Sequence, residues 1–348
     1  MQSKTYIIGE IGQNHNGSVD IAKLIVDTAA LPINEKLFGM ILKGIDAVKL
    51  TKRDLKYELS NSQMNKPNDN DNSFGVTYGE HRDFLELNDE EHYEVYKYAK
   101  SKGLDFVETL CAPSCVSMFK YFEPDRLKVA SRDLTNLPLL EVLAETKIPL
   151  ILSTGMAGKK ELDVALDVIT KQHSNISILH CVSQYPTRPE NVNLNTISYL
   201  SKNYSEYTVG YSDHTIGISV PVAATAMGAK IIEKHITLDR RMKGTDQAGS
   251  LGPDGLVRMV RDIRLMEMSL GNEEIFIEEG VKAAKDKLER SIATNKNLEA
   301  GDIITENDIH LLSPGDGVKW INKGLLVGKK VKETLPKNEI IYLNNIEQ

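Results

Sequence analysis

The chain has 348 residues, with 42 Lys or Arg against 49 Asp or Glu, so its formal net charge is −7 at pH 7. This acidic balance argues against a nucleic-acid-binding protein that relies on bulk positive charge. The sequence contains none of the runs of roughly 18 apolar residues that predict a membrane span, so we expect no membrane association. The first expected strand begins almost at once, which argues against a signal peptide.

Three cysteines, Cys111, Cys115 and Cys181, are an odd number in a long chain. This usage is typical of the reducing cytoplasm, where we expect the protein to reside. Cys111 and Cys115 are spaced like half of a metal site, but no second pair accompanies them. We therefore expect them to pack in the interior rather than to form a zinc site or a disulfide.

Eight short apolar runs organise most of the sequence, and stretches with helical spacing of apolar residues separate most of them. The runs span residues 6–11, 46–50, 105–109, 127–131, 150–154, 176–181, 207–212 and 230–236. This repeated alternation predicts an α/β fold of the (β/α)₈ TIM-barrel type, in which functional groups lie at the carboxyl ends of the strands. The chain exceeds a usual barrel by roughly 100 residues, which leaves room for a small second domain.

A helix and two insertions follow the early strands. Ser18 is a suitable N-cap for a helix from about Val19, because its hydroxyl can accept a hydrogen bond from a first-turn amide. We expect residues 31–42 to lengthen the first helical layer. Residues 60–82 are polar and rich in turn formers, and they follow the second strand. They are either a plain surface loop or a lid over the barrel mouth.

A helix over residues 254–270, closed by Gly271, is expected to end the barrel. We therefore expect a barrel domain over residues 1–271, a charged linker over 272–289 and a small β-rich domain over 290–348. Short β-like runs alternate with turns in this last domain, at residues 290–294, 309–312, 325–328 and 340–343. A domain of about 60 residues buries little core, so we expect it to pack against another part of the assembly.

Two histidines stand at the ends of consecutive expected strands. His214 shares a strand face with Ser212, and His235 shares one with Glu233, because residues i and i+2 of a strand point the same way. The two imidazoles can therefore converge over the barrel mouth, where they suit Mn²⁺, Zn²⁺ or Fe²⁺. Glu10 ends the first strand, which neighbours the eighth in a closed barrel, and could join them directly or through water.

A second set of polar residues around the same mouth suits an anionic substrate. Two ammonium groups and several hydroxyls can neutralise and hydrogen-bond a phosphate and a carboxylate. These candidates are Lys49, Lys128, Ser131, Ser153, Ser183 and Ser212. Any one serine could instead cap a following helix, but four around one rim favour a substrate site.

Several segments of the chain carry motifs in a fixed order. In the expected barrel they lie at residues 8–18, 151–156, 180–187, 210–215 and 233–235, and in the tail at 290–292, 301–305 and 313–317. The first five resemble the sialic acid (N-acetylneuraminate) synthase family. The other three resemble that family's antifreeze-like (SAF) domain, so the resemblance covers essentially the whole chain.

The resemblance implies a metal-dependent transferase that condenses phosphoenolpyruvate with an open-chain hexose or N-acetylhexosamine such as N-acetylmannosamine. The product is a nine-carbon 2-keto-3-deoxy acid (a nonulosonic acid), and phosphate leaves by C–O cleavage. The resemblance places a divalent metal on His214 and His235, for which we expect Mn²⁺ first and Mg²⁺ or Co²⁺ as alternatives. It gives Glu10 a role in orienting metal-bound water or in proton transfer. We also expect a domain-swapped homodimer.

The resemblance also assigns the substrate contacts residue by residue. The family's phosphoenolpyruvate contacts match the two lysines and the serines named above, with Ser183 in place of an asparagine. Its sugar contacts match Thr51, Asp133, Tyr185 and Asp246.

Four positions depart from the family's pattern, and all four concern the sugar. Thr51 stands in place of a glutamine, Asp133 in place of a glutamate, and Cys111 in place of an aromatic residue. Ser313 stands in place of an arginine that reaches into the partner's barrel. We therefore expect the family's reaction with an altered acceptor, either N-acetylmannosamine, mannose or a bacillosamine-derived diacetamido sugar.

Two other interpretations stay open. A Schiff-base keto-acid aldolase would use a lysine nucleophile, with Lys128 as the candidate, and would tolerate chelators. A protein of a different class, a non-catalytic sugar-binding or antifreeze-like protein, would bind ligand without turnover. The polar residues at the barrel mouth argue against this second alternative.

Overall fold

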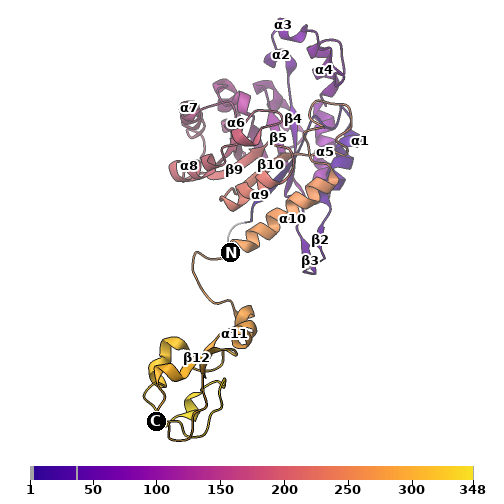
Figure 1. Cartoon of the computed structure of the whole chain (residues 1–348). Coiled ribbons are helices and arrows are strands. Elements are labelled where there is room, and N and C mark those ends of the chain that lie inside the picture. Colours follow the sequence, from indigo (N-terminus) through magenta and orange to yellow (C-terminus); the bar gives the residue numbers. More distant parts are fainter. Residues whose placement is uncertain (1–3, 37, 348) are drawn as a thin grey trace. The chain divides into compact units, whose positions relative to one another are not determined.

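The computed structural model describes residues 4–36 and 38–347, and the chain divides into two compact units, Met1–Gly271 and Asn272–Gln348. The first unit is a closed barrel with the strand order β1-β10-β9-β8-β7-β6-β5-β4, and all its strand pairs are parallel (Figure 1). The predicted (β/α)₈ fold is thus confirmed. The barrel strands are β1 (Tyr6–Gly12), β4 (Ala47–Lys52), β5 (Asp105–Leu110), β6 (Arg126–Val129), β7 (Leu150–Ser153), β8 (Ile176–Cys181), β9 (Thr208–Asp213) and β10 (Ile231–His235).

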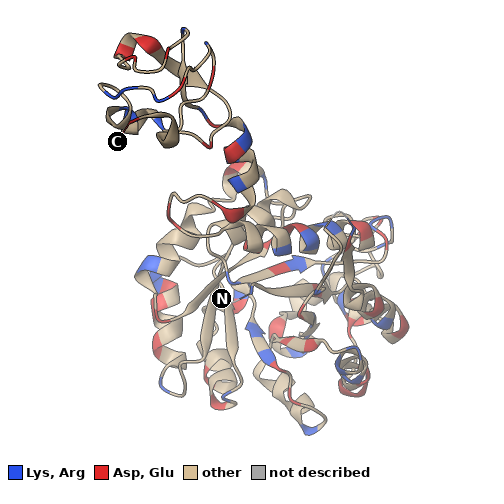
Figure 2. Cartoon of the chain, turned by 90° about the horizontal axis from the view of Figure 1, so that it is seen from below, with Lys and Arg blue, Asp and Glu red and all other residues tan. Residues whose placement is uncertain are grey.

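Helices cover the outside of the barrel, each burying an apolar face against the strands. Helix α1 buries Ala22, Ile25, Val26 and Ala29, and the predicted cap Ser18 accepts a hydrogen bond from the Ile21 amide. Figure 2 shows charged residues spread over these helices, whereas most of the strand ribbon carries none. The outer helices are α1 (Val19–Ala30), α5 (Asp89–Ser101), α6 (Leu137–Glu145), α7 (Lys159–Ile169), α8 (Asn195–Asn203), α9 (Ser219–Ala226) and α10 (Pro253–Ser269). Short 3₁₀ helices η1 (Pro113–Lys120), η2 (Ser131–Asp133) and η3 (Pro189–Asn191) lie in the connections.

The inside of the barrel is filled by side chains in layers, because alternate residues of each strand point inward. Six apolar side chains form one buried cluster, which we call the apolar layer: Ile8, Ala47, Val107, Ile151, Leu179 and Ile231. A second set of side chains, which we call the polar layer, lies two residues further along the strands. It consists of Glu10, Lys49, Thr109, Lys128, Ser153, Cys181, Ser212 and Glu233. The apolar layer closes the barrel below the polar layer, which faces the mouth.

The first insertion differs from the prediction. Instead of lengthening helix α1, residues 31–42 form an antiparallel hairpin of β2 (Ile33–Glu35) and β3 (Met40–Leu42). Pro32 cannot continue a helix, and Leu31 before it is already extended. Gly39 takes a positive φ of 63° in the turn. Leu37, within the same predicted stretch, lies outside the described residues.

The second insertion folds into short helices after β4. Residues 60–82 contain α3 (Asn61–Met64) and the first part of α4 (Tyr78–Leu85), and α2 (Leu55–Glu58) precedes them. The loop between α3 and α4 contacts the segment that follows β10, since the Asn72 side chain accepts a hydrogen bond from the Gly244 amide at 3.4 Å. The Lys243 ammonium lies 5.0 Å from the Phe74 ring centroid. The insertion is thereby attached to a segment at the carboxyl end of the barrel.

The second unit is small and mostly irregular. Its sheet pairs β11 (Ser291–Thr294) with β12 (Ile309–Leu312), at two of the predicted β-like runs. The runs at 325–328 and 340–343 form no strand, and the latter supplies only an isolated bridge between Ile340 and Ala293. Its short helices are η4 (Glu279–Val281), α11 (Lys282–Leu288), η5 (Glu306–Asp308), η6 (Trp320–Leu325) and η7 (Leu343–Asn345).

The segment expected to be a linker, residues 272–289, belongs to this second unit. Helix α11 lies within residues 272–289, and its Asp286 carbonyl accepts a hydrogen bond from the Gly315 amide at 2.7 Å. The Leu288 carbonyl accepts one from the Ser313 hydroxyl at 2.9 Å. The end of the connecting segment is therefore fixed to the domain that follows it.

Arg264 of α10 ties together the amino-terminal ends of the first strands. Its guanidinium donates to the Thr5 carbonyl at 2.7 Å and to the Asp46 carboxylate at 2.9 Å, and it is almost fully buried. These bonds anchor the last barrel helix to the residues that precede β1 and β4. Arg264 therefore helps to close the barrel at the end opposite the mouth.

We expect Arg264→Met to lower the free energy of unfolding by about 3 kcal/mol, because it leaves the largely buried Asp46 carboxylate without this partner. Urea denaturation of the two proteins measures the difference. Arg261→Met is the control, since Arg261 forms a more exposed pair with Asp262 and such pairs contribute little. Equal losses in the two variants would contradict this role for Arg264.

Candidate active site

A cavity of about 310 Å³ opens at the carboxyl ends of the barrel strands. The polar layer forms its floor, and residues further along the strands and loops form its walls. Twelve of the thirteen residues predicted from the sequence line it: Glu10, Lys49, Thr51, Lys128, Ser131, Ser153, Ser183, Tyr185, Ser212, His214, His235 and Asp246. The thirteenth, Asp133, lines a neighbouring cavity that shares Arg53 and Arg132 with the first.

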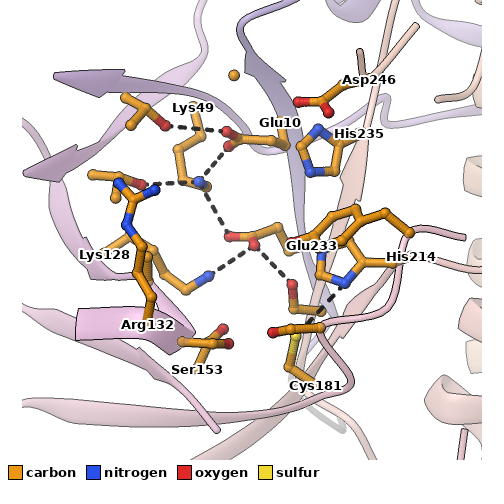
Figure 3. A pocket seen from close by; sticks show the side chains of 18 of the residues that line it. Glu10, Lys49, Lys128, Arg132, Ser153, Cys181, His214, Glu233, His235 and Asp246 are labelled. Carbon is orange, nitrogen blue, oxygen red and sulfur yellow. Dashed lines mark hydrogen bonds and ion pairs between the residues drawn. The ribbon is translucent and has the colours of Figure 1, made fainter. Parts of the chain in front are cut away.

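Glu233 lies between the two lysines at the centre of the floor (Figure 3). Its carboxylate is 2.8 Å from the Lys128 ammonium and 3.8 Å from that of Lys49, and it accepts a hydrogen bond from Ser212 at 2.9 Å. Lys49 also forms an ion pair with Glu10 and donates to Thr109 at 2.9 Å. Two buried ammonium groups and two buried carboxylates thus neutralise one another.

The two carboxyl groups differ in their electrostatics. Burial opposes ionisation of Glu233, but the ammonium groups of Lys128 and Lys49 outweigh it and hold the pKa of Glu233 well below its ordinary value. Burial dominates at Glu10 and raises its pKa to about 7, despite the neighbouring Lys49. Glu233 is therefore a fixed anion, whereas Glu10 can gain or lose a proton near neutral pH.

Two predicted serines, Ser131 and Ser183, lie close to Gly155 in the loop after β7. The Ser131 hydroxyl accepts a hydrogen bond from the Gly155 amide at 3.0 Å. A Cβ atom at Gly155 would lie only 2.4 Å from the Ser183 hydroxyl and 2.8 Å from that of Ser131, so glycine is required for this approach. The buried Ser153 hydroxyl makes no hydrogen bond with any described residue. Hydroxyl groups are thus available on the Lys128 side of the cavity.

The two histidines converge as expected from their strand positions. Their ring centroids are 5.6 Å apart. The Nδ1 atom of His214 lies 3.0 Å from the Val182 carbonyl, an arrangement that directs Nε2 away from that contact. His235 is partly buried, and this desolvation lowers its pKa. Its Nδ1 atom is buried and has no hydrogen-bond partner among the described residues. A neutral imidazole with an unpartnered buried nitrogen is suited to a divalent metal.

The residues predicted to contact a sugar are spread over two cavities. Tyr185 is 62% exposed, and its ring centroid lies 4.1 Å from that of His214. Asp246 lines the cavity beside His235, and the Thr51 hydroxyl donates to Glu10 at 3.4 Å. Asp133 instead forms an ion pair with Arg132 at 3.3 Å and faces the neighbouring cavity.

Sequence reasoning missed three charged residues of this region. It did not name Glu233 as a site residue, although Glu233 shares a strand face with His235. It also missed Arg53 and Arg132, which lie at the junction of the two cavities and both contact Glu58, at 2.7 and 3.2 Å. Arg132 directly follows the predicted residue Ser131, so its place in the sequence could have indicated it. The direction of its side chain depends on the turn η2.

Both units of the chain match known protein families. Residues 40–275 match the NeuB family and residues 289–347 match the SAF domain. The chain is 33% identical to the N-acetylneuraminate-9-phosphate synthase of Homo sapiens, covering 98% of this chain and 92% of that protein. It is also 33% identical to the N,N'-diacetyllegionaminic acid synthase of Legionella pneumophila, covering 98% and 94%. Among solved structures, an N-acetylneuraminic acid synthetase from Leptospira borgpetersenii matches with a TM-score of 0.66 and 30% identity over 81% of this chain and 90% of that one.

We expect Lys128→Met to weaken the binding of inorganic phosphate by about 10- to 150-fold, because it removes a charge-assisted contact from the cavity floor. Isothermal titration calorimetry measures the affinity. Lys52→Met is the matched control, since Lys52 also lies on a barrel strand but bonds the Leu87 carbonyl and Asp89 outside this cavity. A similar loss of affinity in both variants would refute an anion site at Lys128.

Proposed function

The chain belongs to the NeuB family, and from this premise we propose that it condenses phosphoenolpyruvate with an open-chain hexose or N-acetylhexosamine. The product would be a nine-carbon 2-keto-3-deoxy acid, with release of phosphate. One observation carries the proposal: two lysines and several hydroxyl groups face a pair of histidines across a single cavity. This arrangement can hold a doubly charged anion on one side and an aldehyde on the other.

Lys49, Lys128 and the serines would bind phosphoenolpyruvate. Each ammonium is paired with a glutamate. The phosphate and carboxylate of the substrate can take over part of this pairing, and the Ser131, Ser153 and Ser183 hydroxyls can donate hydrogen bonds to their oxygens. The reacting double bond would thereby be fixed with its C3 atom toward the acceptor.

His214 and His235 would hold a divalent metal, with Mn²⁺ as our first choice and Mg²⁺ or Co²⁺ as alternatives. The described residues contain no cluster of three or more metal-ligating side chains, so these two imidazoles are the protein ligands that we propose. A metal bound there would polarise the aldehyde of the open-chain sugar. Tyr185, Asp246 and Thr51 line the same part of the cavity and would orient the sugar chain.

Glu10 would accept a proton during the addition of water. C3 of phosphoenolpyruvate attacks the aldehyde carbon, and the cationic C2 that results adds a water molecule. Glu10 can accept a proton from that water, because its pKa is near 7 and its carboxylate lies beside Lys49. Glu10 can then pass that proton to the alkoxide formed from the aldehyde. The tetrahedral centre loses phosphate by cleavage of the C2–O bond, C2 becomes the keto carbon, and the remaining hydroxyl proton leaves with the phosphate.

We also propose a cytoplasmic homodimer in which the SAF domain of one protomer completes the sugar site of the other. The small core of this domain supports a role in packing against a partner. Ser313 stands where the family has arginine, but the Arg290 guanidinium donates to its hydroxyl at 3.0 Å. Arg290 could therefore supply the missing cation. None of the helices in the described part of the chain has the length and apolarity needed to cross a membrane.

Phosphate release from phosphoenolpyruvate across a panel of hexoses and hexosamines tests the function directly. We expect release with at least one acceptor, its loss on chelation, and its loss in His214→Ala and His235→Ala. A Schiff-base aldolase would tolerate the chelator, and borohydride would trap Lys128 on a keto acid. Absence of phosphate release with every acceptor would favour a binding protein instead.

The pH dependence of kcat/KM tests the role of Glu10. A proton acceptor must be ionised, so activity is expected to rise as pH increases through about 7, the pKa of Glu10. In Glu10→Gln the rate should fall and this limb of the profile should disappear. A profile with the same limb in the variant would assign the titration to another group.

A further inference from the structure

A buried ion pair lies next to the two histidines in the sequence, between residues that do not line the cavity of about 310 Å³. Lys234 stands between Glu233 and His235 on β10, so its side chain points away from the cavity that they line. Asp213, its register partner on β9, precedes His214. The two side chains form an ion pair, and both are at most 1% exposed.

Asp213 and Lys234 fix the turn that carries His214. The Asp213 carboxylate accepts hydrogen bonds from Tyr211 at 2.9 Å, from the Thr215 amide at 3.1 Å and from the Thr215 hydroxyl at 3.0 Å. The Lys234 ammonium also bonds the Thr215 carbonyl. The residues on both sides of His214 are therefore held by one buried cluster.

The same cluster connects the two histidines to each other. His214 is bracketed by Asp213 and Thr215, and His235 directly follows Lys234. The ion pair thus joins the end of β9 to the end of β10 at the point where both imidazoles enter the cavity. The main chain of His214 is restrained further, because its carbonyl accepts a hydrogen bond from the Thr187 amide at 2.9 Å.

We propose that Asp213 and Lys234 are positioning residues that hold the His214 and His235 imidazoles at the separation needed to bind one divalent cation. This inference rests on the proposed metal site but assigns a role to residues that do not line its floor. Some residues orient metal ligands without contacting the metal themselves. Their removal commonly lowers metal affinity by about 10- to 100-fold. A buried ion pair serves this purpose well, because neither partner can move away without leaving an unpaired charge.

The test is the affinity of the full-length protein for Mn²⁺ alone, measured by calorimetry in the absence of substrates. We expect Lys234→Met to weaken Mn²⁺ binding by about 10- to 100-fold. Phosphate binding should be unchanged, because the lysines of the floor are untouched. Asp213 keeps its three neutral donors in this variant, which favours a folded protein. Thr215→Val is a milder variant that removes one hydrogen bond, and it should weaken Mn²⁺ binding by about 2- to 10-fold.

Arg264→Met is the matched control, since it breaks a buried ion pair at the other end of the barrel. It should lower stability without changing Mn²⁺ affinity. If Lys234→Met and Thr215→Val both bind Mn²⁺ like the parent protein, the positioning role is refuted while the metal site stands. If the parent protein itself binds no Mn²⁺, the proposed metal site is refuted together with this inference.

Discussion

Closure of the barrel is the constraint on which the rest of this structure depends. Once eight parallel strands close, alternate residues of each strand must point into a space that only side chains can fill. The apolar layer fills the lower part with Ile8, Val107, Ile151 and their neighbours. Two residues further along each strand, the same geometry gathers polar side chains at the mouth. The functional site is thus a consequence of strand register as well as of residue type.

Burial of charge in the polar layer has an energetic cost that the layer itself offsets. Lys49 and Lys128 lie almost fully buried, and their charges are neutralised by Glu10 and Glu233. The arrangement leaves the cavity preorganised for an anion, because the ammonium groups are already in place and need only exchange partners. It also separates the two carboxyl groups into one fixed anion and one group that can titrate near neutral pH.

Buried charged residues also lie on the outer side of the same strands. Lys234 and Asp213 are as deeply buried as the floor of the cavity, but they bond main-chain groups of the turn after β9 instead of facing a substrate. In the second unit, the Arg290 guanidinium donates a hydrogen bond to the Ser313 hydroxyl. In both places a charged group bonds a neighbouring residue, a contact that a motif comparison does not show.

The sequence by itself determined the barrel, the ends of its strands and most of the site, since these follow from local pattern. Residues that alternate along a strand keep their faces in any parallel barrel, so Glu10, His214 and His235 could be placed from spacing alone. The prediction for residues 31–42 was wrong, because Pro32 redirects the chain into a hairpin. The sequence also did not show that the turn η2 directs Asp133 into the neighbouring cavity. Only the tertiary structure decided that Glu233 lies between two lysines from β4 and β6 and that Lys234 pairs with Asp213. These pairings join residues up to 184 positions apart, and strand closure, not local propensity, brings such residues together.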